Sequence, residues 1–245
     1  MKDNFSRQAS IYSKFRPDYP DELIEFILEH TEGRSQAWDC GTGNGQFAKK
    51  LSPHFKRIFG TDISDRQLNN AEKRSNIIYQ KERAESSSFQ ENQFDLITVA
   101  QAIHWFDFKA FYAEVRRTLK PGGTFCVSGY SLLRINPTVN EVIDYFYSEI
   151  IGPYWDPERK YIDENYRTIP FPFKEIICPE FHFKSRWTID QLKGYLNTWS
   201  SVQHYLADQG KDPVKLITPL LHEAWGIHTT KEVHFPILLR MGKTE

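Results

Sequence analysis

Short apolar runs alternate with amphipathic stretches through the first half of the chain. Runs bounded by polar or turn residues predict strands, whereas apolar residues at three- and four-residue steps predict helices. Strands are predicted over 36–40, 57–62, 77–81, 94–100 and 123–130, and helices over 21–30, 45–52, 65–74 and 108–119. Strands interleaved with helices indicate βαβ units. We therefore predict an α/β fold with a doubly wound, mostly parallel sheet and helices on both faces.

The pattern changes after Tyr130, where prolines become frequent. Helical patterns follow over 137–151, 188–208 and 213–225, and strand patterns over 181–187 and 232–242. Pro236 lies in the last of these and favours an edge or bulge position, because proline cannot donate to a sheet. We expect a single domain over residues 1–245, in which 21–130 form the core and 131–245 complete the sheet and add a helical cap.

Composition restricts the class of protein further. The 245 residues are 40% hydrophobic and 26% charged, which is ordinary for a globular protein. The formal net charge of -1 disfavours nucleic acid or an anionic membrane as a partner. No run approaches the roughly 18 apolar residues of a membrane span. Cys40, Cys126 and Cys178 are far apart, as expected for thiols in a reducing compartment. We expect a cytoplasmic protein.

The stretch "AWDCGTGNGQFA" (37–48) carries the clearest chemistry. Asp39 ends a predicted strand, and Gly41, Gly43 and Gly45 follow at alternate positions, which lets the chain turn sharply close to a ligand. The dinucleotide fingerprint is GxGxxG, and a carboxylate here would repel a pyrophosphate but suit a cationic amine. Asp62 ends the next strand, where a carboxylate can bind ribose hydroxyls. These residues together favour S-adenosylmethionine over a dinucleotide.

Five motifs in this order resemble those of class I, Rossmann-like S-adenosylmethionine-dependent methyltransferases: "WDCGTGNG", "GTDIS", "ERAES", "FDLITVAQAIHWF" and "LKPGGTF". The combination of "YSKFRPDYP" with "AQAIHWF" is similar to the trans-aconitate methyltransferase-like group. The resemblance implies a seven-stranded sheet, with its last strand antiparallel and beside the fifth, and S-adenosyl-L-methionine as the cofactor. Besides the glycines and the two acids, it implies cofactor contacts from Thr42, Ile63, Ala84, Glu85, Ala100 and Gln101.

The resemblance also implies that residues 1–20 form a lid over the cofactor, with Tyr12 and Arg16 folding onto it. An ordinary helix start with a surface arginine is the alternative for this stretch. A surface position is likewise the alternative for Glu85, because "AESSS" could belong to any polar loop.

His104 follows the fourth predicted strand, where the resemblance puts the transferred methyl group. It is a candidate general base; alternatively, it is a buried residue packed beside Trp105. Trp105 and Trp199 are candidate acceptor contacts, and no spacing of histidines with cysteines or carboxylates indicates a metal site. A carboxylate acceptor is already ionised and needs no base. We therefore favour methyl transfer to a small molecule, at a carboxylate oxygen.

Other interpretations remain open from the sequence alone. Arg134, Arg159 and Arg186 could anchor an acidic acceptor, with a surface position as the alternative for each. A non-enzymatic S-adenosylmethionine-binding module would keep the same fold without turnover. An NAD(P)-dependent oxidoreductase is disfavoured by the GxGxG spacing and the missing Tyr-xxx-Lys pair. The sequence does not indicate an oligomeric state.

Overall fold

The computed structural model describes residues 17–244, so Tyr12 and Arg16 of the expected lid lie outside the described residues. The described strands are β1 (Gln36–Cys40), β2 (Arg57–Asp62), β3 (Ile77–Lys81), β4 (Phe94–Ala100), β5 (Leu119–Tyr130), β6 (Lys174–Ile176), β7 (Phe181–Trp187) and β8 (Lys231–Lys243). They form one sheet in the order β3-β2-β1-β4-β5-β8-β6, and β7 pairs with the N-terminal half of β8, residues 231–237.

The pairing directions confirm the predicted fold class. Strands β3, β2, β1, β4 and β5 are parallel, whereas β8 is antiparallel to β5 and to its other neighbours β6 and β7. The last strand thus lies antiparallel beside the fifth, as expected. The sheet has one more strand than the seven expected, because the short β6 carries no apolar alternation that would have indicated it.

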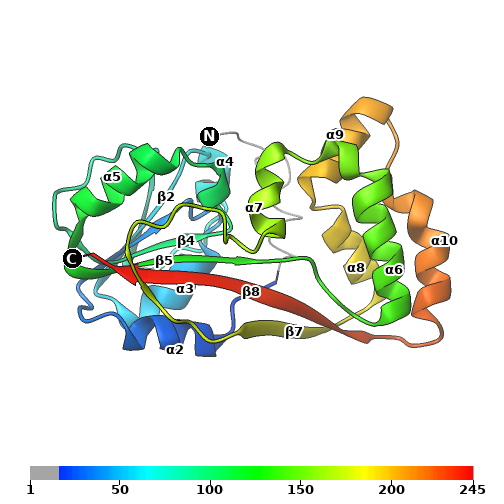
Figure 1. The fold of residues 1–245 in the computed structure, drawn as a ribbon, viewed down its shortest axis with the longest axis horizontal. Helices are drawn as coiled ribbons and strands as arrows, with labels where there is room; N and C mark the ends of the chain where they lie inside the picture. The colour runs from blue at the N-terminus through cyan, green and yellow to red at the C-terminus, as the bar shows by residue number, and fades with distance from the viewer. Residues whose placement is uncertain (1–16, 245) are drawn as a thin grey trace.

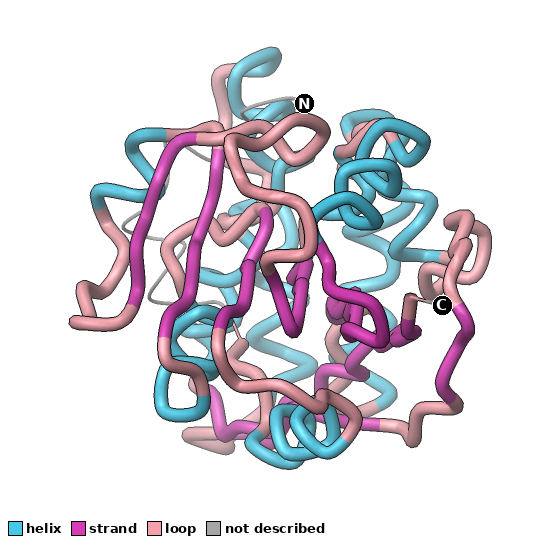
Figure 2. Tube along the Cα trace, turned by 90° about the vertical axis from the view of Figure 1, so that its left-hand side faces the viewer, coloured by secondary structure: helices cyan, strands magenta, loops and turns pink. Residues whose placement is uncertain are grey.

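Helices cover both faces of the sheet (Figure 1). Helices α2 (Asp21–Glu29) and α3 (Gln46–Leu51) bury apolar residues in the core on one face, and α5 (Phe108–Thr118) buries Phe111 and Val115 in the core on the other. The short α4 (Asp65–Asn69) starts directly after β2, with Ser64 accepting a hydrogen bond from Gln67 N as its N-cap. Figure 2, turned by 90°, shows the strands side by side with helices packed around them.

Helices of the second half gather at one end of the sheet (Figure 1). This helical lobe consists of α6 (Pro137–Tyr145), α8 (Ile189–Leu196), α9 (Ser200–Gln209) and α10 (Val214–Trp225). Strands β7 and β8 run out of the sheet toward the lobe, and the short α7 (Lys160–Asp163) lies between the lobe and the strand ends. No helix among residues 17–244 combines the length and the apolar character needed to span a membrane.

Several predicted boundaries were wrong, each for a local reason. The helix expected over 188–208 is broken at 197–199, where Thr198 Oγ1 donates to the Tyr195 carbonyl (2.6 Å) and Trp199 adopts an extended backbone. The helix expected over 65–74 ends at Asn69, and Asn70 follows as its C-cap. The helix over 137–151 is α-helical only to Tyr145 and continues as a π-helix over 146–150.

The edge position expected for Pro236 and the predicted start of the fifth strand were also wrong. Strand β8 is internal rather than an edge, and Pro236 stands opposite His182 of β7. On its other side, the regular β5 pairs end at Tyr130–Ile237, Ser131 N donates to the Pro236 carbonyl (3.0 Å), and pairing resumes one residue out of register at Arg134–His234. Pro236 therefore lies at a bulge, which was the other position expected for it. Strand β5 begins at Leu119 rather than 123, with a register shift against β4 that accommodates Gly122 at φ +71°.

Candidate active site

A cleft lies at the carboxyl ends of the parallel strands, at the point where β2 and β4 flank β1. Open α/β sheets bind ligands at such a switch in strand order, because the loops on either side of it diverge. The described lining residues come from the ends of β1, β2, β4 and β5, from the turns that follow, from the starts of α3 and α4, and from the residue Tyr19 ahead of α2. They are Tyr19, Gly41, Thr42, Gly43, Asn44, Gln46, Phe47, Asp62, Ile63, Ser64, Gln67, Ala100, Gln101, Ala102, Trp105 and Tyr130.

The glycine turn between β1 and α3 has three left-handed residues, with φ of +68°, +56° and +81° at Gly41, Gly43 and Gly45. A Cβ at Gly41 would lie 2.6 Å from Ala102 Cβ, and one at Gly45 would overlap the Tyr79 hydroxyl. A Cβ at Gly43 would meet no protein atom within 4 Å, and Gly43 lines the cleft. Two glycines therefore allow the turn to pack, while Gly43 leaves space that a ligand can fill.

Asp39 was expected to face a cationic amine directly, but its carboxylate points into the glycine turn and is fully buried. Its Oδ2 accepts from Thr42 Oγ1 (2.5 Å) and from the Ala48 amide (3.1 Å), and its Oδ1 accepts from Thr98 Oγ1 (2.9 Å). Burial raises the pKa of Asp39 to about 6, against the opposing effect of these hydrogen bonds. Asp39 therefore joins β1, the turn and α3, and does not line the cleft.

Asp62 does line the cleft, at the end of β2. Its Oδ2 accepts from the Gly43 amide (3.0 Å) and its Oδ1 from the Ser64 amide (2.9 Å), so the carboxylate is fixed relative to the glycine turn. One helical turn further on, Gln67 is 5% exposed, and its Oε1 has no hydrogen-bond partner among residues 17–244. An unpaired buried acceptor is unfavourable, so Gln67 adds a group that a bound donor would satisfy.

Gln101 follows β4 on the opposite side of the cleft and has the unusual φ of +54°. Its amide Nε2 donates to the Tyr130 carbonyl (3.0 Å), and its Oε1 accepts from the Tyr166 hydroxyl (3.2 Å). Tyr166 is fully buried and also left-handed, at φ +60°. A Cβ at Gly129 would come within 3.0 Å of both side chains. This packing fixes the Gln101 side chain at the edge of the cleft.

The comparisons with known proteins agree with this geometry. A family described as a methyltransferase domain matches residues 38–127, which run from β1 into β5 and include the glycine turn. Over 251 aligned residues, the chain is 35% identical to a Dictyostelium discoideum protein named as a methyltransferase, with 99% of this chain and 95% of that protein covered. The chain belongs to the class I S-adenosylmethionine-dependent methyltransferases.

Solved structures of other methyltransferases have the same architecture. One from Anaeromyxobacter dehalogenans, described as type II, is 37% identical, with a TM-score of 0.86 over 94% of this chain and 98% of that one. The fold also matches a Haemonchus contortus phosphoethanolamine N-methyltransferase in complex with S-adenosylhomocysteine, at a TM-score of 0.50 and 17% identity over 98% of this chain and 58% of that one. The latter similarity concerns the fold alone.

The methyltransferase cofactor fits the described residues. The open space at Gly43, the carboxylate of Asp62 and the unpaired Gln67 Oε1 all border one cleft. Among residues 17–244, no group of three or more histidines, cysteines and carboxylates is arranged to hold a metal ion.

His104 does not line the methyltransferase cleft and is 6% exposed. Its ring packs against Trp105 (4.9 Å between centroids), as the alternative interpretation expected, and its Nδ1 lies 3.4 Å from the Tyr166 hydroxyl. Burial, with a smaller contribution from the charge of Arg159, lowers the pKa of His104 to about 3. So weak a base takes up protons poorly at neutral pH, which argues against the general-base interpretation.

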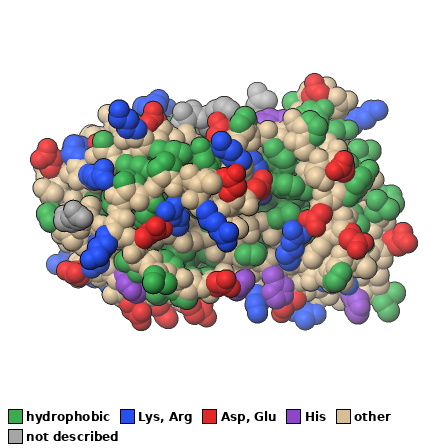
Figure 3. Space-filling model, in the orientation of Figure 1, with side chains coloured by type: hydrophobic (Ala, Val, Ile, Leu, Met, Phe, Trp, Pro, Cys, Tyr) green, Lys and Arg blue, Asp and Glu red, His purple; other side chains and the backbone are tan. Residues whose placement is uncertain are grey.

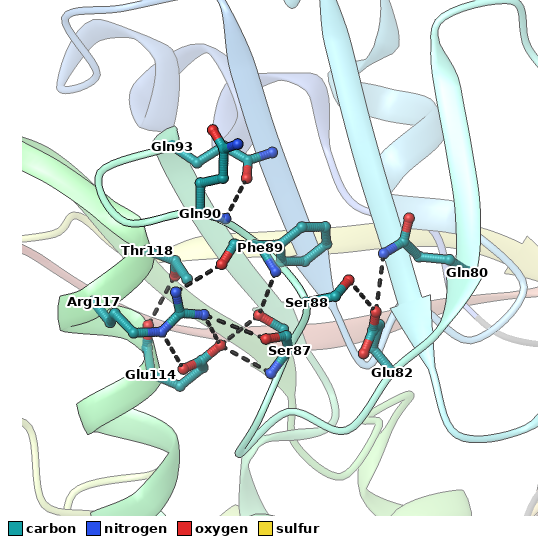
Figure 4. Close-up of polar contacts among 10 residues, drawn as sticks. All are labelled: Gln80, Glu82, Ser87, Ser88, Phe89, Gln90, Gln93, Glu114, Arg117 and Thr118. Atoms are coloured by element: carbon teal, nitrogen blue, oxygen red, sulfur yellow. Dashed lines mark hydrogen bonds and ion pairs between the residues drawn. The ribbon is translucent and has the colours of Figure 1, made fainter.

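Ala84 and Glu85 lie on the loop after β3 and are not among the described residues that line the cleft. Glu114 of α5 accepts from Ser87 N (2.9 Å), while Arg117 donates to the Phe89 carbonyl (2.6 Å) and pairs with Glu114 (Figure 4). Glu85 Oε1 accepts from the Asp107 amide (3.3 Å), which ties the loop to the N-cap of α5. The loop is therefore held in place, but the described structure brings neither Ala84 nor Glu85 into the cleft.

The two tryptophans predicted as acceptor contacts lie in different parts of the molecule. Trp105 lines the cleft, whereas Trp199 is 3% exposed in the core of the helical lobe, between Phe146, Trp155 and Tyr195. Trp199 is therefore absent from the described cleft lining, and its sequence pattern could not show this because indoles pack equally well in a core and in a binding site.

Sequence reasoning also missed several lining residues. Asn44, Gln46, Ser64 and Ala102 lie next to the predicted contacts and could have been inferred from their position in the same motifs. Gln67 follows Asp62 by about one helical turn, which is a weaker indication. Tyr19 belongs to the stretch 1–20 that was expected to cover the cofactor, although it was not named as a contact. Tyr130 carries no local pattern that distinguishes it from a core tyrosine, and only the tertiary structure brings it to the cleft.

Proposed function

We propose that this enzyme methylates a small-molecule acceptor at a carboxylate oxygen, with the cofactor bound between the glycine turn, Asp62 and the end of β4. In this proposal Asp62 binds the ribose hydroxyls, because it already faces the cleft with its position fixed by two backbone amides. Ile63 and Gln67 border the nucleoside, and Gly43 allows the amino-acid part to lie against the backbone.

The other predicted cofactor residues take supporting roles. Asp39 fixes the turn from behind by accepting a hydrogen bond from Thr42, which itself lines the cleft. Ala100 and Gln101 face the methyl end of the cofactor from the end of β4. A carboxylate behind the turn also favours the positive charge of the cofactor through space. Ala84 and Glu85 remain predicted neighbours of the adenine.

One observation carries the choice of acceptor atom. Among the described residues that line the cleft, Asp62 is the one carboxylate, and the set includes no histidine or lysine. S-adenosylmethionine, when bound, supplies a methyl group whose carbon bonds the acceptor oxygen as the bond to sulfur breaks and the sulfonium becomes a neutral thioether. A carboxylate acceptor has no proton to lose, so this set of residues suffices to hold and align the reactants.

A small acceptor is supported by the surroundings of the cleft. The helical lobe adjoins the strand ends, and we propose that it covers the acceptor within a single domain (Figure 1). On the face drawn in Figure 3, lysine and arginine side chains are interspersed with aspartate and glutamate, unlike the one-sign surface that nucleic acids select. Free cysteines at 40, 126 and 178 support our proposal of a cytoplasmic location.

The test has a binding arm and a turnover arm. Calorimetry should show S-adenosylhomocysteine binding with a micromolar dissociation constant, and transfer of label from methyl-labelled S-adenosylmethionine should be followed with small carboxylic acids, phenols and amines. We expect S-adenosylhomocysteine to bind and the acids alone to become labelled. The labelled products should lose their label in base, because methyl esters hydrolyse there. Turnover of phenols or amines alone would contradict the carboxylate assignment. Including trans-aconitate in the panel tests the predicted subgroup.

A further inference from the structure

Gln101 has a strained backbone at the edge of the cleft. Its φ of +54° lies in a region that residues with a side chain rarely occupy. Its amide N donates to the Ser128 carbonyl (2.8 Å), which fixes the backbone just beyond the end of β4. Gln101 lines the cleft at the end where the proposed function puts the transferred methyl group. Strained residues persist only where the surrounding structure holds them, and such places are often functional sites.

The residue that contacts the Gln101 side chain is itself strained. Tyr166 lies in the turn after α7 with φ of +60°, and the preceding Asn165 has φ of +53°. Tyr166 N donates to the Tyr161 carbonyl (2.7 Å), and Arg240 Nη1 of β8 donates to the Tyr166 carbonyl (3.0 Å). These backbone bonds hold the turn so that the fully buried Tyr166 side chain reaches Gln101, which lies 65 residues earlier in the chain.

The chemistry of the partners fixes the direction of each side-chain hydrogen bond at Gln101. The Tyr130 carbonyl can only accept, so it receives Gln101 Nε2 (3.0 Å), and Gln101 Oε1 faces the Tyr166 hydroxyl (3.2 Å). That amide oxygen also only accepts, so the hydroxyl proton points to it. His104 Nδ1 lies 3.4 Å from the same hydroxyl and must then be a donor. The donors thus run from His104 through Tyr166 to Gln101 and end on the backbone of β5.

This chain of hydrogen bonds specifies the state of His104. Burial lowers the pKa of His104 to about 3, so the ring is neutral near pH 7 and carries its proton on Nδ1. The turn η3 (Ile103–Trp105) holds the imidazole between the rings of Trp105 and Tyr166, at centroid distances of 4.9 and 6.1 Å. Buried polar networks whose members are satisfied are rigid, so the Gln101 carboxamide has one fixed orientation.

We propose that Tyr166 is a positioning residue for methyl transfer, which acts by fixing the Gln101 carboxamide beside the transferred methyl group. In-line transfer needs the acceptor, the methyl carbon and the departing sulfur aligned, and a displacement of about 1 Å can reduce the rate about 100-fold. Tyr166 is not among the described residues that line the cleft, so it acts through Gln101. The inference rests on the position of the methyl group in the proposed function and holds for any acceptor atom.

The experiment compares wild type with Tyr166→Phe, which keeps the buried ring and removes only the hydroxyl. Each protein is saturated with S-adenosylmethionine that carries carbon-13 in its methyl group, and the NMR resonance of the bound methyl group is recorded. We expect this resonance to shift in Tyr166→Phe and in Gln101→Leu, because both variants change the polar groups beside the methyl group. The double variant should give the same resonance as Gln101→Leu alone, since Tyr166 acts through Gln101.

Two further measurements separate positioning from folding. With an acceptor that wild type methylates, kcat of Tyr166→Phe should fall about 10-fold, while KM for S-adenosylmethionine changes less than about 3-fold. Nitrogen-15 NMR of His104 should show the Nδ1–H tautomer in wild type and a mixture of tautomers in Tyr166→Phe. The Nε2–H tautomer in wild type would contradict the direction of the hydrogen bonds.

Tyr112→Phe is the matched control. Tyr112 is 4% exposed, and its hydroxyl donates to the Pro170 carbonyl away from the described cleft lining. This variant should keep the methyl resonance and the kcat of wild type. A lowered thermal midpoint in Tyr166→Phe, with no change at the methyl group, would show a purely structural role and overturn the inference.

The Gln101→Leu variant distinguishes the inference from the proposed function. If it leaves the methyl resonance unchanged, the methyl group does not lie beside Gln101, and both the proposed placement and the inference are wrong. If Gln101→Leu shifts the resonance and Tyr166→Phe does not, only the positioning role of Tyr166 is wrong.

Discussion

The glycine turn and the helical lobe of this methyltransferase use their buried residues in opposite ways. In the turn, left-handed glycines and a buried carboxylate with a raised pKa create an unfavourable local structure beside a cleft. In the lobe, Trp199 packs against Phe146, Trp155 and Tyr195 in an aromatic core. The turn keeps its unfavourable conformation because it serves ligand binding, whereas the lobe stabilises the fold by burying apolar area.

This contrast shows why burial alone does not identify a functional residue. Asp39 and Trp199 are both buried, at 0% and 3% exposure, and neither lines the cleft. Replacing Trp199 should affect folding and leave cofactor binding intact, whereas replacing Asp39 should do the reverse. Four substitutions test the contrast, beginning with the one of largest expected effect.

Trp199→Ala should lower the free energy of unfolding by about 3–5 kcal/mol, because it removes a buried indole and leaves a cavity. Chemical denaturation measures this change. At a temperature where the variant is folded, its affinity for S-adenosylhomocysteine should equal that of wild type. Leu216→Ala, on the exposed side of α10 at 54% exposure, serves as a control and should change stability by less than about 0.5 kcal/mol. Weakened cofactor binding in Trp199→Ala would show that the two regions are not separate.

Gly43→Ala should weaken S-adenosylhomocysteine binding by about 30-fold or more, because the new methyl group would occupy the space proposed for the ligand. Gly122→Ala is a close control. Gly122 is also left-handed, at φ +71° against +56° for Gly43, and a Cβ at either position would meet no protein atom within 4 Å. Both variants should lose roughly 1–2 kcal/mol of stability from the backbone alone. Equal cofactor affinity in both, measured by calorimetry, would contradict the assigned site.

Asp39→Asn should weaken S-adenosylmethionine binding by about 10-fold near pH 7.5, since a neutral amide lacks the attraction for the cofactor's positive charge. The pKa of Asp39 is about 6 in the folded protein, above its ordinary value of 3.8. Ionised Asp39 therefore lowers the free energy of unfolding by roughly 3 kcal/mol above pH 6. As pH falls from 6 toward 3.8, that cost disappears. The variant should therefore be at least as stable as wild type near pH 7.5.

The pH dependence of affinity gives a second measurement for Asp39. Wild-type affinity for S-adenosylmethionine should fall as pH drops through about 6, where the carboxyl becomes protonated, and should approach the value of Asp39→Asn. The variant should show no such change. Identical pH profiles in the two proteins would mean that the charge of Asp39 does not act on the cofactor.

His104→Phe should have the smallest effect, with kcat changed less than about 3-fold near pH 7.5, because a histidine of pKa about 3 does not act as a base there. In wild type the unfolded chain takes up a proton at this histidine below about pH 6.5, while the folded protein does so only near pH 3, so this residue lowers stability as pH falls. Thermal scans at decreasing pH should show that the variant loses less stability. A large loss of kcat would restore the general-base role.

Local patterns predicted the cofactor half of the fold well. Strands β1, β2, β3 and β4 coincide with the predicted ranges, because each is a short apolar run between polar or turn residues. In the helical lobe, the break at 197–199 depends on where the Trp199 indole packs, which residue spacing along one helix does not specify. The short β6 depends on its pairing with β8 and likewise has no local pattern.

The site was predictable to a similar extent. The motifs located Gly43 and Asp62, which line the cleft, since a glycine turn and a strand-end acid are local features. They did not give the orientation of Asp39, because Thr98, which bonds it, lies on a neighbouring strand 59 residues further along the chain. Likewise, the burial of His104 depends on Tyr166, which comes from the second half of the chain.

A crystal structure with S-adenosylhomocysteine tests the central claim most directly. The account predicts electron density for the ribose within hydrogen-bond distance of the Asp62 carboxylate, with the amino-acid part lying over Gly43 and the sulfur toward Gln101. Density for the nucleoside at any other place in the molecule, or in this cleft without contact to Asp62, would contradict the account.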